Sequence, residues 1–319
     1  MKRVTLGLSG LNVFPMALGT ADYGLPRIPQ ADAFQQMDLY ARLGGNVLDT
    51  AEVYSNWVPG EKSRSEKLIG QWLKQSGLSD GMHISTKGGH PLFESMDKPR
   101  LSNAQLDDDL KRSLDNLGIE RIDLYFLHRD DASRPVDEIV DYLEEKKQAG
   151  LIGAYGLSNW TLARVQQAAE YAKRRGITGF SVNQIYWSLA RINPDAIADK
   201  TLVPMDEAFH QYHVDTGMAA MAYTSQAKGY LSKRHLAQAI EPDLGAQYEG
   251  AHNDAVIKLL SPWCRAHQCD PSQAVLWWFM TQPFAAVPVV SPRTLAQLHT
   301  LMDAANAEHP PLPEGLPAW

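Results

Sequence analysis

Eight short apolar runs recur along almost the whole 319-residue chain, and an amphipathic helical pattern separates nearly every run from the next. This alternation is typical of a parallel sheet whose strands are joined by crossover helices. Eight evenly repeated units favour a closed (β/α)8 TIM barrel over a doubly wound open sheet. The expected strands are Met16–Leu18, Asn46–Asp49, His83–Lys87, Ile122–His128, Gly153–Leu157, Ser181–Gln184, Gly217–Tyr223 and Ala285–Val290.

The expected helices carry recognisable ends. Ser63 followed by Glu66 predicts a capping box, and so does Ser102 followed by Gln105. Asp254 precedes a further apolar-periodic run. Left-handed C-terminal caps are expected at Gly44, Gly77, Gly118, Gly150 and Gly176. The helices are predicted at Gln30–Leu43, Ser63–Gln75, Ser102–Leu117, Val136–Ala149, Thr161–Arg175, Thr201–His213 and Thr294–Ala304.

Three segments lie outside the repeated units. Val4–Leu8 and Asn12–Phe14 predict a β-hairpin before the first barrel strand. Lys228–Asn253, after the seventh strand, is polar and irregular, and two helices are expected to follow it, at 254–266 and 271–281. A long loop at a barrel mouth is more often functional than idle. The proline-rich tail from His309 is expected to be extended, and residues 1–319 to form one domain.

Composition excludes several classes of function. The chain carries 30 basic and 37 acidic residues, a net charge of −7, which argues against general nucleic-acid binding. The start of the chain lacks the apolar core of a signal peptide, and the apolar stretch 274–290 is interrupted, so no membrane span is expected. Cys264 and Cys269 have no nearby residues to complete a metal set and are expected to be reduced thiols in a cytoplasmic protein. Composition leaves the oligomeric state open, a homo-oligomer included.

Four polar residues fall at or just past the ends of three expected strands: Asp49, Tyr54, Lys87 and His128. The C-terminal ends of barrel strands meet at one mouth, so these side chains should gather there. An ammonium lowers the pKa of a neighbouring phenol, a carboxylate keeps the ammonium charged, and an imidazole can hydrogen-bond a substrate oxygen. The set forms a proton-donating site for a carbonyl group. With no redox group of its own, it needs a hydride source such as a nicotinamide.

Six segments carry a resemblance to a known family: Leu18–Thr20, Asn46–Tyr54, Ile84–Lys87, Leu110–Gly118, Ile122–His128 and Gly156–Asn159. Through them the chain resembles the aldo-keto reductase superfamily over nearly its entire length. That resemblance implies a (β/α)8 barrel and NADPH-dependent reduction of an aldehyde or ketone. It also implies a tetrad in which Tyr54 is the general acid, Lys87 tunes its pKa, Asp49 pairs with Lys87 and His128 orients the carbonyl.

The same resemblance implies a cofactor site. Ser158, Asn159 and Gln184 would hold the nicotinamide carboxamide, and Tyr223 would stack on the ring. Ser158–Asn159 could instead cap the following helix, and Arg293 could be a solvated first-turn residue. A guanidinium suits a dianionic 2′-phosphate, so NADP is expected rather than NAD. The other cofactor residues implied are Gly19, Thr20, Asp49, Thr224, Ser225, Gln226, Lys228, Ser291, Arg293 and Gln297.

The expected substrate pocket mixes aromatic faces with charge, which favours a sugar or polyol-derived carbonyl. The segment 129–131 is equally compatible with ion pairing within its loop. A rival interpretation is a cofactor-sensing binding module, because the chain also resembles potassium channel β-subunits, which keep the tetrad. No inactivating N-terminal extension is expected, and measurable turnover would discriminate. A lyase or hydrolase barrel lacks a metal cluster or paired carboxylates in the sequence. The pocket residues implied are Tyr23, Tyr54, Trp57, His128, Arg129 and Trp187.

Overall fold

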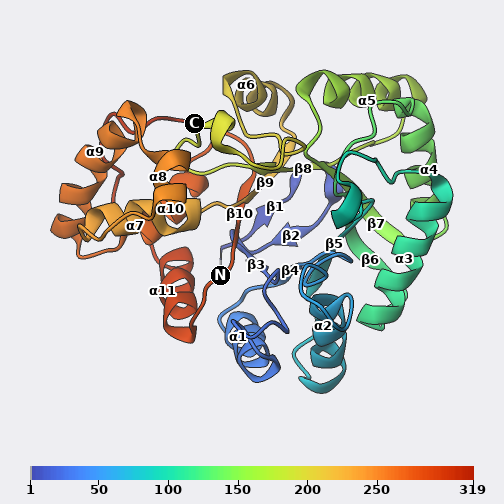
Figure 1. The fold of residues 1–319 in the computed structure, drawn as a ribbon, viewed down its shortest axis with the longest axis horizontal. Helices are drawn as coiled ribbons and strands as arrows, with labels where there is room; N and C mark the ends of the chain where they lie inside the picture. The colour runs from blue at the N-terminus through green and yellow to red at the C-terminus, as the bar shows by residue number, and fades with distance from the viewer. Residues whose placement is uncertain (1) are drawn as a thin grey trace.

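A computed structural model describes residues 2–319 of the chain. Its centre is a closed barrel of eight parallel strands in chain order, in which the last strand pairs with the first. The (β/α)8 prediction is therefore confirmed (Figure 1). The strands are β3 (Ala17–Gly19), β4 (Val47–Asp49), β5 (His83–Gly88), β6 (Ile122–Leu127), β7 (Ile152–Ser158), β8 (Val182–Tyr186), β9 (Ala219–Tyr223) and β10 (Ala286–Val290).

Helices surround the barrel, as Figure 1 shows. The capping box at Ser102 and Gln105 is confirmed, and all five predicted glycine caps have positive φ. The capping box at Ser63 is wrong, because this residue has φ 55° and its hydroxyl donates to Glu52 instead. The barrel helices are α1 (Gln30–Arg42), α2 (Arg64–Gln75), α3 (Asn103–Leu117), α4 (Val136–Gln148), α5 (Leu162–Arg175), α6 (Glu207–Thr216) and α11 (Leu295–Asn306).

The helix predicted from Thr201 starts later, because Asp206 caps α6 and Pro204 precedes it. The segment predicted to be irregular contains two short helices, α7 (Tyr230–His235) and α8 (Pro242–Tyr248). Their aromatic and leucine side chains are buried, so tertiary packing supplies the stability that such short helices lack alone.

Two longer helices complete the seventh connection, α9 (Ala251–His267) and α10 (Pro271–Met280). Asp254 lies inside the first turn of α9, where it pairs with Arg234, and so does not begin the helix as predicted. Figure 1 shows α7 to α10 grouped on one side of the barrel. Cys264 and Cys269 are free thiols. Within residues 2–319, no helix has the length and apolar character needed to cross a membrane.

The predicted N-terminal hairpin is present and closes one end of the barrel. It consists of β1 (Val4–Thr5), the short helix η1 (Gly7–Ser9) and β2 (Asn12–Val13). Leu6 and Val13 join the apolar cluster that fills the barrel interior. Gly7 has φ +52°, and a Cβ there would lie 2.8 Å from the Ser181 carbonyl oxygen. The end of the barrel that the hairpin closes is therefore tightly packed, and only the opposite end, where the strands end, is available for a functional site.

Candidate active site

The ammonium of Lys87 is the centre of the polar cluster at the strand ends. It lies on β5, is 1% exposed, and donates three hydrogen bonds: to Asp49 Oδ2 at 2.8 Å, to the Thr50 carbonyl at 2.6 Å and to Tyr54 Oη at 3.1 Å. An ammonium has three donors and no acceptor. All three N–H groups of the Lys87 ammonium are thus hydrogen-bonded, and one of them donates to the phenol oxygen of Tyr54.

Asp49 accepts three side-chain hydrogen bonds, two from β5 and one from β8. Oδ2 accepts from Lys87, while Oδ1 accepts from Ser85 Oγ at 3.0 Å and Gln184 Nε2 at 2.7 Å. The carboxylate is 2% exposed, and the Lys87–Asp49 ion pair is fully enclosed. Because a buried charge is costly without partners, this pairing holds both groups in place.

The pKa of Tyr54 moves in the direction opposite to the sequence-based expectation. Burial raises the pKa of the phenol above its ordinary value, and the nearby Lys87 ammonium opposes that rise without reversing it. Burial alone lowers the pKa of Lys87, but Asp49 and Tyr54 raise it by more than burial lowers it, so the pKa of Lys87 is raised above its ordinary value. At neutral pH the pair is therefore an ammonium beside a protonated phenol, the state of a proton donor.

His128 follows β6 and lies against the phenol. Its ring centroid is 6.0 Å from that of Tyr54, and burial, with Arg129 close by, lowers its pKa well below the ordinary value. The imidazole is therefore neutral. Its Nδ1 is buried without a hydrogen-bond partner among the described residues.

Two residues that the sequence reasoning missed extend this cluster, His90 and Phe93 in the loop after β5. The His90 ring lies 4.7 Å from that of His128 and 5.3 Å from that of Phe93. Trp57 lies 6.4 Å from Phe93 and 6.2 Å from Tyr54. The signal for this loop was the pair Gly88–Gly89 directly after Lys87, which marks a sharp turn back over the mouth.

Three of the expected substrate residues are not available as predicted. Tyr23 is fully buried, and its hydroxyl donates to Gln36 on α1. Arg129 is 7% exposed and pairs with Asp199 at 3.0 Å. Of the two interpretations of segment 129–131, substrate contact and ion pairing, this contact supports ion pairing. Trp187 is 3% exposed and packs among aromatic side chains of α10.

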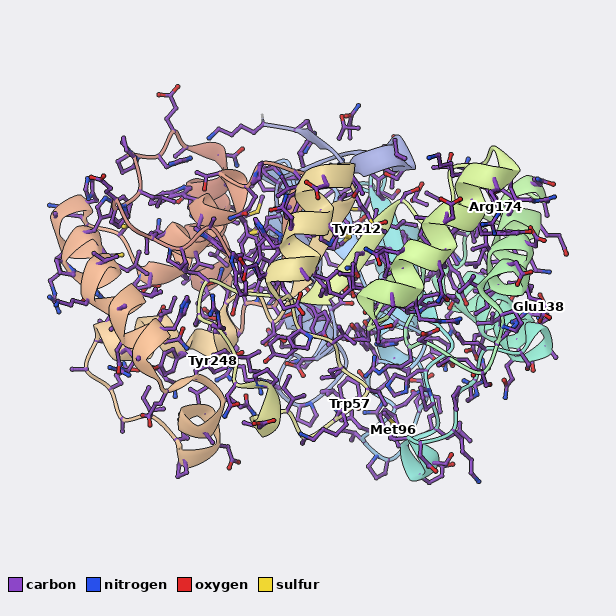
Figure 2. All side chains as sticks on the ribbon, turned by 90° about the horizontal axis from the view of Figure 1, so that it is seen from above. Trp57, Met96, Glu138, Arg174, Tyr212 and Tyr248 are labelled. Carbon is purple, nitrogen blue, oxygen red and sulfur yellow. The ribbon has the colours of Figure 1, made fainter. Side chains whose placement is uncertain are left out.

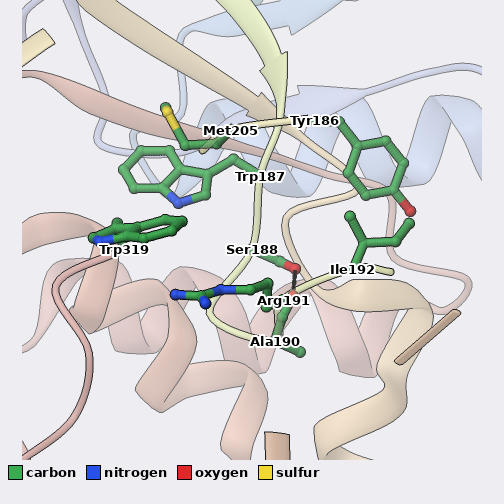
Figure 3. Close-up of a pocket in the computed structure, with 8 residues that line it drawn as sticks. All are labelled: Tyr186, Trp187, Ser188, Ala190, Arg191, Ile192, Met205 and Trp319. Carbon is green, nitrogen blue, oxygen red and sulfur yellow. Dashed lines mark hydrogen bonds between the residues drawn. The ribbon is translucent and has the colours of Figure 1, made fainter. Parts of the chain in front are cut away.

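Trp187 does border a small cavity, shown in Figure 3. The cavity has a volume of about 20 Å³, the size of one water molecule. Trp319 covers it, with the Arg191 guanidinium 4.0 Å from the Trp319 ring centroid. A space this small does not accept a carbonyl substrate.

The turn after β9 has an irregular backbone. Thr224, Ala227, Lys228 and Gly229 all have positive φ, between 45° and 82°. The backbone N–H groups of Ala227 and Gly229 donate to the carbonyls of Thr224 and Gln226 within the turn, both at 2.8 Å. Within the turn, the hydroxyl of Ser225 donates to Val289, and the Lys228 ammonium donates to Gln247. Gln226 donates to Ser272, so this side chain anchors the turn to α10.

The amide of Asn159 is saturated by the protein. Nδ2 donates to the His128 carbonyl and to Ser158 Oγ, while Oδ1 accepts from Tyr223 Oη at 2.6 Å and from the Val203 backbone. A carboxamide reaches Asn159 only by displacing one of these partners. Thr161 is the N-cap of α5, so the alternative role of Ser158–Asn159 as the helix cap is wrong.

The remaining cofactor candidates surround the ends of β3 and β10. Ser291 and Arg293 are exposed after β10, and Arg293 has no ion-pair partner in the part of the chain that is described. A Cβ on Gly19 would lie 2.7 Å from Ser291 Oγ, so glycine is needed for this close approach. Gln297 accepts from the Arg293 backbone, and Thr20 is buried with its hydroxyl bound to the Asp49 carbonyl.

These residues fit a dinucleotide in its phosphate-binding parts. The exposed guanidinium of Arg293, which has no ion-pair partner among the described residues, provides charge for a phosphate. The expected site of the nicotinamide carboxamide is less accessible, because Asn159 and Gln184 already hydrogen-bond protein groups.

Comparisons with known proteins identify the family of the chain. The model of the Aldo/keto reductase family matches residues 15–311. The chain is 28% identical over 324 residues to aldo-keto reductase ausK of Emericella nidulans, covering 95% of this chain and 77% of that protein. It is 26% identical over 316 residues to the uncharacterized oxidoreductase YrpG of Bacillus subtilis, covering 96% and 91%. Norsolorinic acid reductase stcV of Emericella nidulans is 26% identical over 321 residues, covering 96% and 78%.

A solved structure also resembles the barrel. Aldo-keto reductase AKR11C1 from Bacillus halodurans, in its holo form, superposes with a TM-score of 0.71 at 24% identity, covering 97% of this chain and 92% of that chain. At this identity the likeness concerns the fold alone. The family match extends over most of the chain, and members of that family use nicotinamide cofactors. This chain belongs to the aldo-keto reductase family and is an oxidoreductase that acts on carbonyl groups.

Proposed function

We propose that the protein reduces an aldehyde or ketone to the alcohol with NADPH, and that Tyr54 donates the proton to the carbonyl oxygen. The observation that carries this proposal is the 3.1 Å hydrogen bond from Lys87 Nζ to Tyr54 Oη. Since the ammonium can only donate, the phenol oxygen accepts, and the phenolic proton is left to point toward another acceptor. A substrate carbonyl oxygen is the natural one.

Each residue around the phenol then has a defined role. Tyr54 holds its proton at Oη because burial raises its pKa, and it releases that proton to the oxygen as negative charge develops there. Lys87 stabilises the phenolate that remains, since its ammonium already lies at hydrogen-bond distance. Asp49 keeps the ammonium charged and fixed through its bond to Nζ.

His128 acts as a neutral hydrogen-bonding group. Because its pKa is lowered, His128 carries no extra proton that it could give to the substrate in place of Tyr54. The imidazole therefore orients the carbonyl oxygen without protonating it. Its position 6.0 Å from the Tyr54 ring lets both side chains approach one oxygen atom.

The cofactor is proposed to be NADPH, held by the turn 224–229, by Tyr223 and by the segment 291–297. A bound reduced nicotinamide supplies the hydride. Arg293 supports a preference for NADPH over NADH because a guanidinium pairs strongly with a dianionic phosphate. We further propose that residues 1–319 act as one catalytic domain.

The substrate is proposed to be a small carbonyl compound that enters beside Tyr54. The expectation of a sugar depended on charge at the mouth, above all on Arg129. That guanidinium is engaged by Asp199, Thr201 and the His128 carbonyl. The polar argument for a sugar therefore loses its main support, while the argument for a carbonyl does not depend on it.

The test is Tyr54→Phe, which removes the phenolic proton and leaves the ring. We expect turnover of aldehydes with NADPH to be lost while NADPH binding, measured by quenching of its fluorescence, remains. Retained turnover in this variant would remove Tyr54 from its proposed role. The matched control is Tyr171→Phe, a tyrosine on α5 whose hydroxyl bonds Asp141 at the surface.

A further inference from the structure

A short turn after β4, residues 50–54, places Tyr54 beside Lys87. The backbone of this turn is fixed to β5, because the Glu52 N–H donates to the Lys87 carbonyl at 3.1 Å. Figure 2 shows Trp57, three residues beyond Tyr54, at the end of the molecule opposite the N-terminal hairpin. Glu52 is therefore bonded through its backbone to the residue whose ammonium donates to the phenol, so a shift of Glu52 would change the distance between the two groups.

The side chain of Glu52 extends from this turn into the layer of helices and is largely buried. Its Oε1 accepts from Ser63 Oγ at 3.1 Å, just before α2, and lies 3.3 Å from Arg112 Nε on α3. Burial raises the pKa of Glu52, and the Arg112 guanidinium opposes that rise. The ionisable groups that face Glu52 from the surrounding elements are Arg112 and Asp109 on α3, Arg100 before it, Glu66 on α2 and Tyr125 on β6.

Arg112 also reaches the segment that follows Lys87. Its Nη2 donates to Asp109 Oδ1 at 3.1 Å, and Asp109 Oδ2 accepts from the Gly89 backbone at 2.9 Å. Asp109 is 1% exposed and pairs with Arg100 as well, so it is held firmly. One guanidinium thus connects the two segments whose side chains share the hydrogen bond of the proposed proton donor.

The pair of Glu52 and Arg112 has little to offer the stability of the fold. The Arg112 side chain is 49% exposed, and ion pairs with a solvated partner contribute little. Enclosing a carboxylate is costly in itself. What the arrangement does supply is a fixed position, since the Glu52 carboxylate is held from α3 and from the residue before α2. These observations favour a role in placing the turn over a role in stabilising the protein.

We propose that Glu52 and Arg112 are positioning residues for the proton transfer, and that their ion pair holds Tyr54 Oη at hydrogen-bond distance from Lys87 Nζ. Neither is a catalytic residue, since both act through the phenol. The inference rests on the proposed reductase function and adds two residues that lie outside the polar cluster at the strand ends.

The test compares Glu52→Gln with Arg112→Met, because these variants remove opposite charges. By charge alone, loss of the carboxylate would lower the pKa of the Tyr54 phenol, and loss of the guanidinium would raise it. If the ion pair positions the phenol, both variants loosen the hydrogen bond from Lys87 that favours the phenolate. Both should then raise the pKa of Tyr54, by about half a unit to one unit.

The first measurement is fluorine NMR of the NADP-loaded protein with 3-fluorotyrosine at position 54, which follows ionisation of the phenol without turnover. The second is reduction of butanal with NADPH. We expect kcat to fall by about tenfold in each variant while KM for NADPH stays the same, because a small displacement of a reacting group slows the reaction strongly. The double variant should lose no more than one single variant, because both changes remove the same ion pair.

Two further variants complete the comparison. Arg112→Lys keeps a cation beside Glu52 and should restore part of the lost kcat. The matched control is Lys111→Met, which removes an exposed ion pair with Asp115 from the same helix and should leave both measurements unchanged.

Shifts of opposite sign in Glu52→Gln and Arg112→Met would show that charge alone acts and would overturn the inference. An unchanged kcat in both variants, or additive losses in the double variant, would overturn it as well. If Arg112→Met does not fold, Glu52→Gln decides alone, because charge and positioning predict opposite shifts for it. If the unmodified protein reduces no aldehyde, the proposed function has failed instead. The fluorine titration then decides the inference separately: upward shifts in both variants support it, and any other result refutes it.

Discussion

Glu66 offers a direct test of the electrostatics behind the barrel. It lies on α2, is fully buried, and accepts hydrogen bonds from Thr86 at 2.7 Å and Asn116 at 3.0 Å. Both partners are neutral, so nothing adjacent balances an ionised carboxylate. Burial raises the pKa of Glu66 from 4.5 to about 7.

The pH dependence follows from that direction. Between pH 4.5 and about 7 the folded protein holds a proton on Glu66 that the unfolded chain has released. The contribution of this group to stability is therefore fully present below 4.5 and is lost as the pH rises through 7. A difference of 2.5 pKa units corresponds to about 3 kcal/mol of unfolding free energy.

The substitution is Glu66→Gln, which reproduces the neutral carboxyl. Its amide oxygen can still accept from Asn116, and its NH2 group can donate to Thr86 Oγ1 or to Ser113 Oγ, which has no partner within the described residues. We expect the variant to match the original protein near pH 5 and to exceed it by up to about 3 kcal/mol at pH 8, a rise in Tm of about 4 °C for a chain of this length.

The assay is urea denaturation followed by circular dichroism at both pH values. Glu61→Gln is the control, because Glu61 is exposed and pairs with Lys67 at the surface. A Glu66→Gln protein whose advantage fails to grow between pH 5 and pH 8 would refute the reasoning. So would an equal gain in the control.

Two further predictions concern the proposed site. Lys87→Met removes the ammonium that stabilises the phenolate, so the pH at which alcohol oxidation proceeds should rise by about one to three units, or oxidation should be lost; an unchanged pH profile of kcat/KM contradicts the assigned role. Arg293→Ala should raise KM for NADPH by about tenfold and KM for NADH much less, because only the former carries the 2′-phosphate. Equal effects on both cofactors would show that Arg293 does not contact that phosphate.

The barrel and the polar cluster could be predicted because both leave local marks in the sequence. Strands buried on both sides appear as apolar runs, and Asp49, Lys87 and His128 occur where such runs end. Their meeting follows from parallel order alone. The glycine caps were predictable for the same reason, since left-handed φ angles select for glycine.

The errors concern contacts between distant parts of the chain. Arg129 pairs with a residue 70 positions away, and no local pattern announces that Asp199 will neutralise it. The helices α7 and α8 are too short to be stable without the surfaces they pack on. The direction of the Tyr54 pKa depended on how completely the fold encloses the phenol, which is a property of the whole mouth.

Asp49 accepts from Lys87 on the neighbouring strand β5 and from Gln184 on β8. In the closed barrel β5 is the neighbour of β4, whereas β8 lies four strands from β4 in either direction, on the opposite wall. The Asp49 carboxylate therefore fixes the Lys87 ammonium relative to Gln184 on the opposite wall of the barrel. A change that loosens the closure of the barrel, even far from the mouth, would move Lys87 relative to the phenol and would be detected as altered proton transfer before it was detected as unfolding.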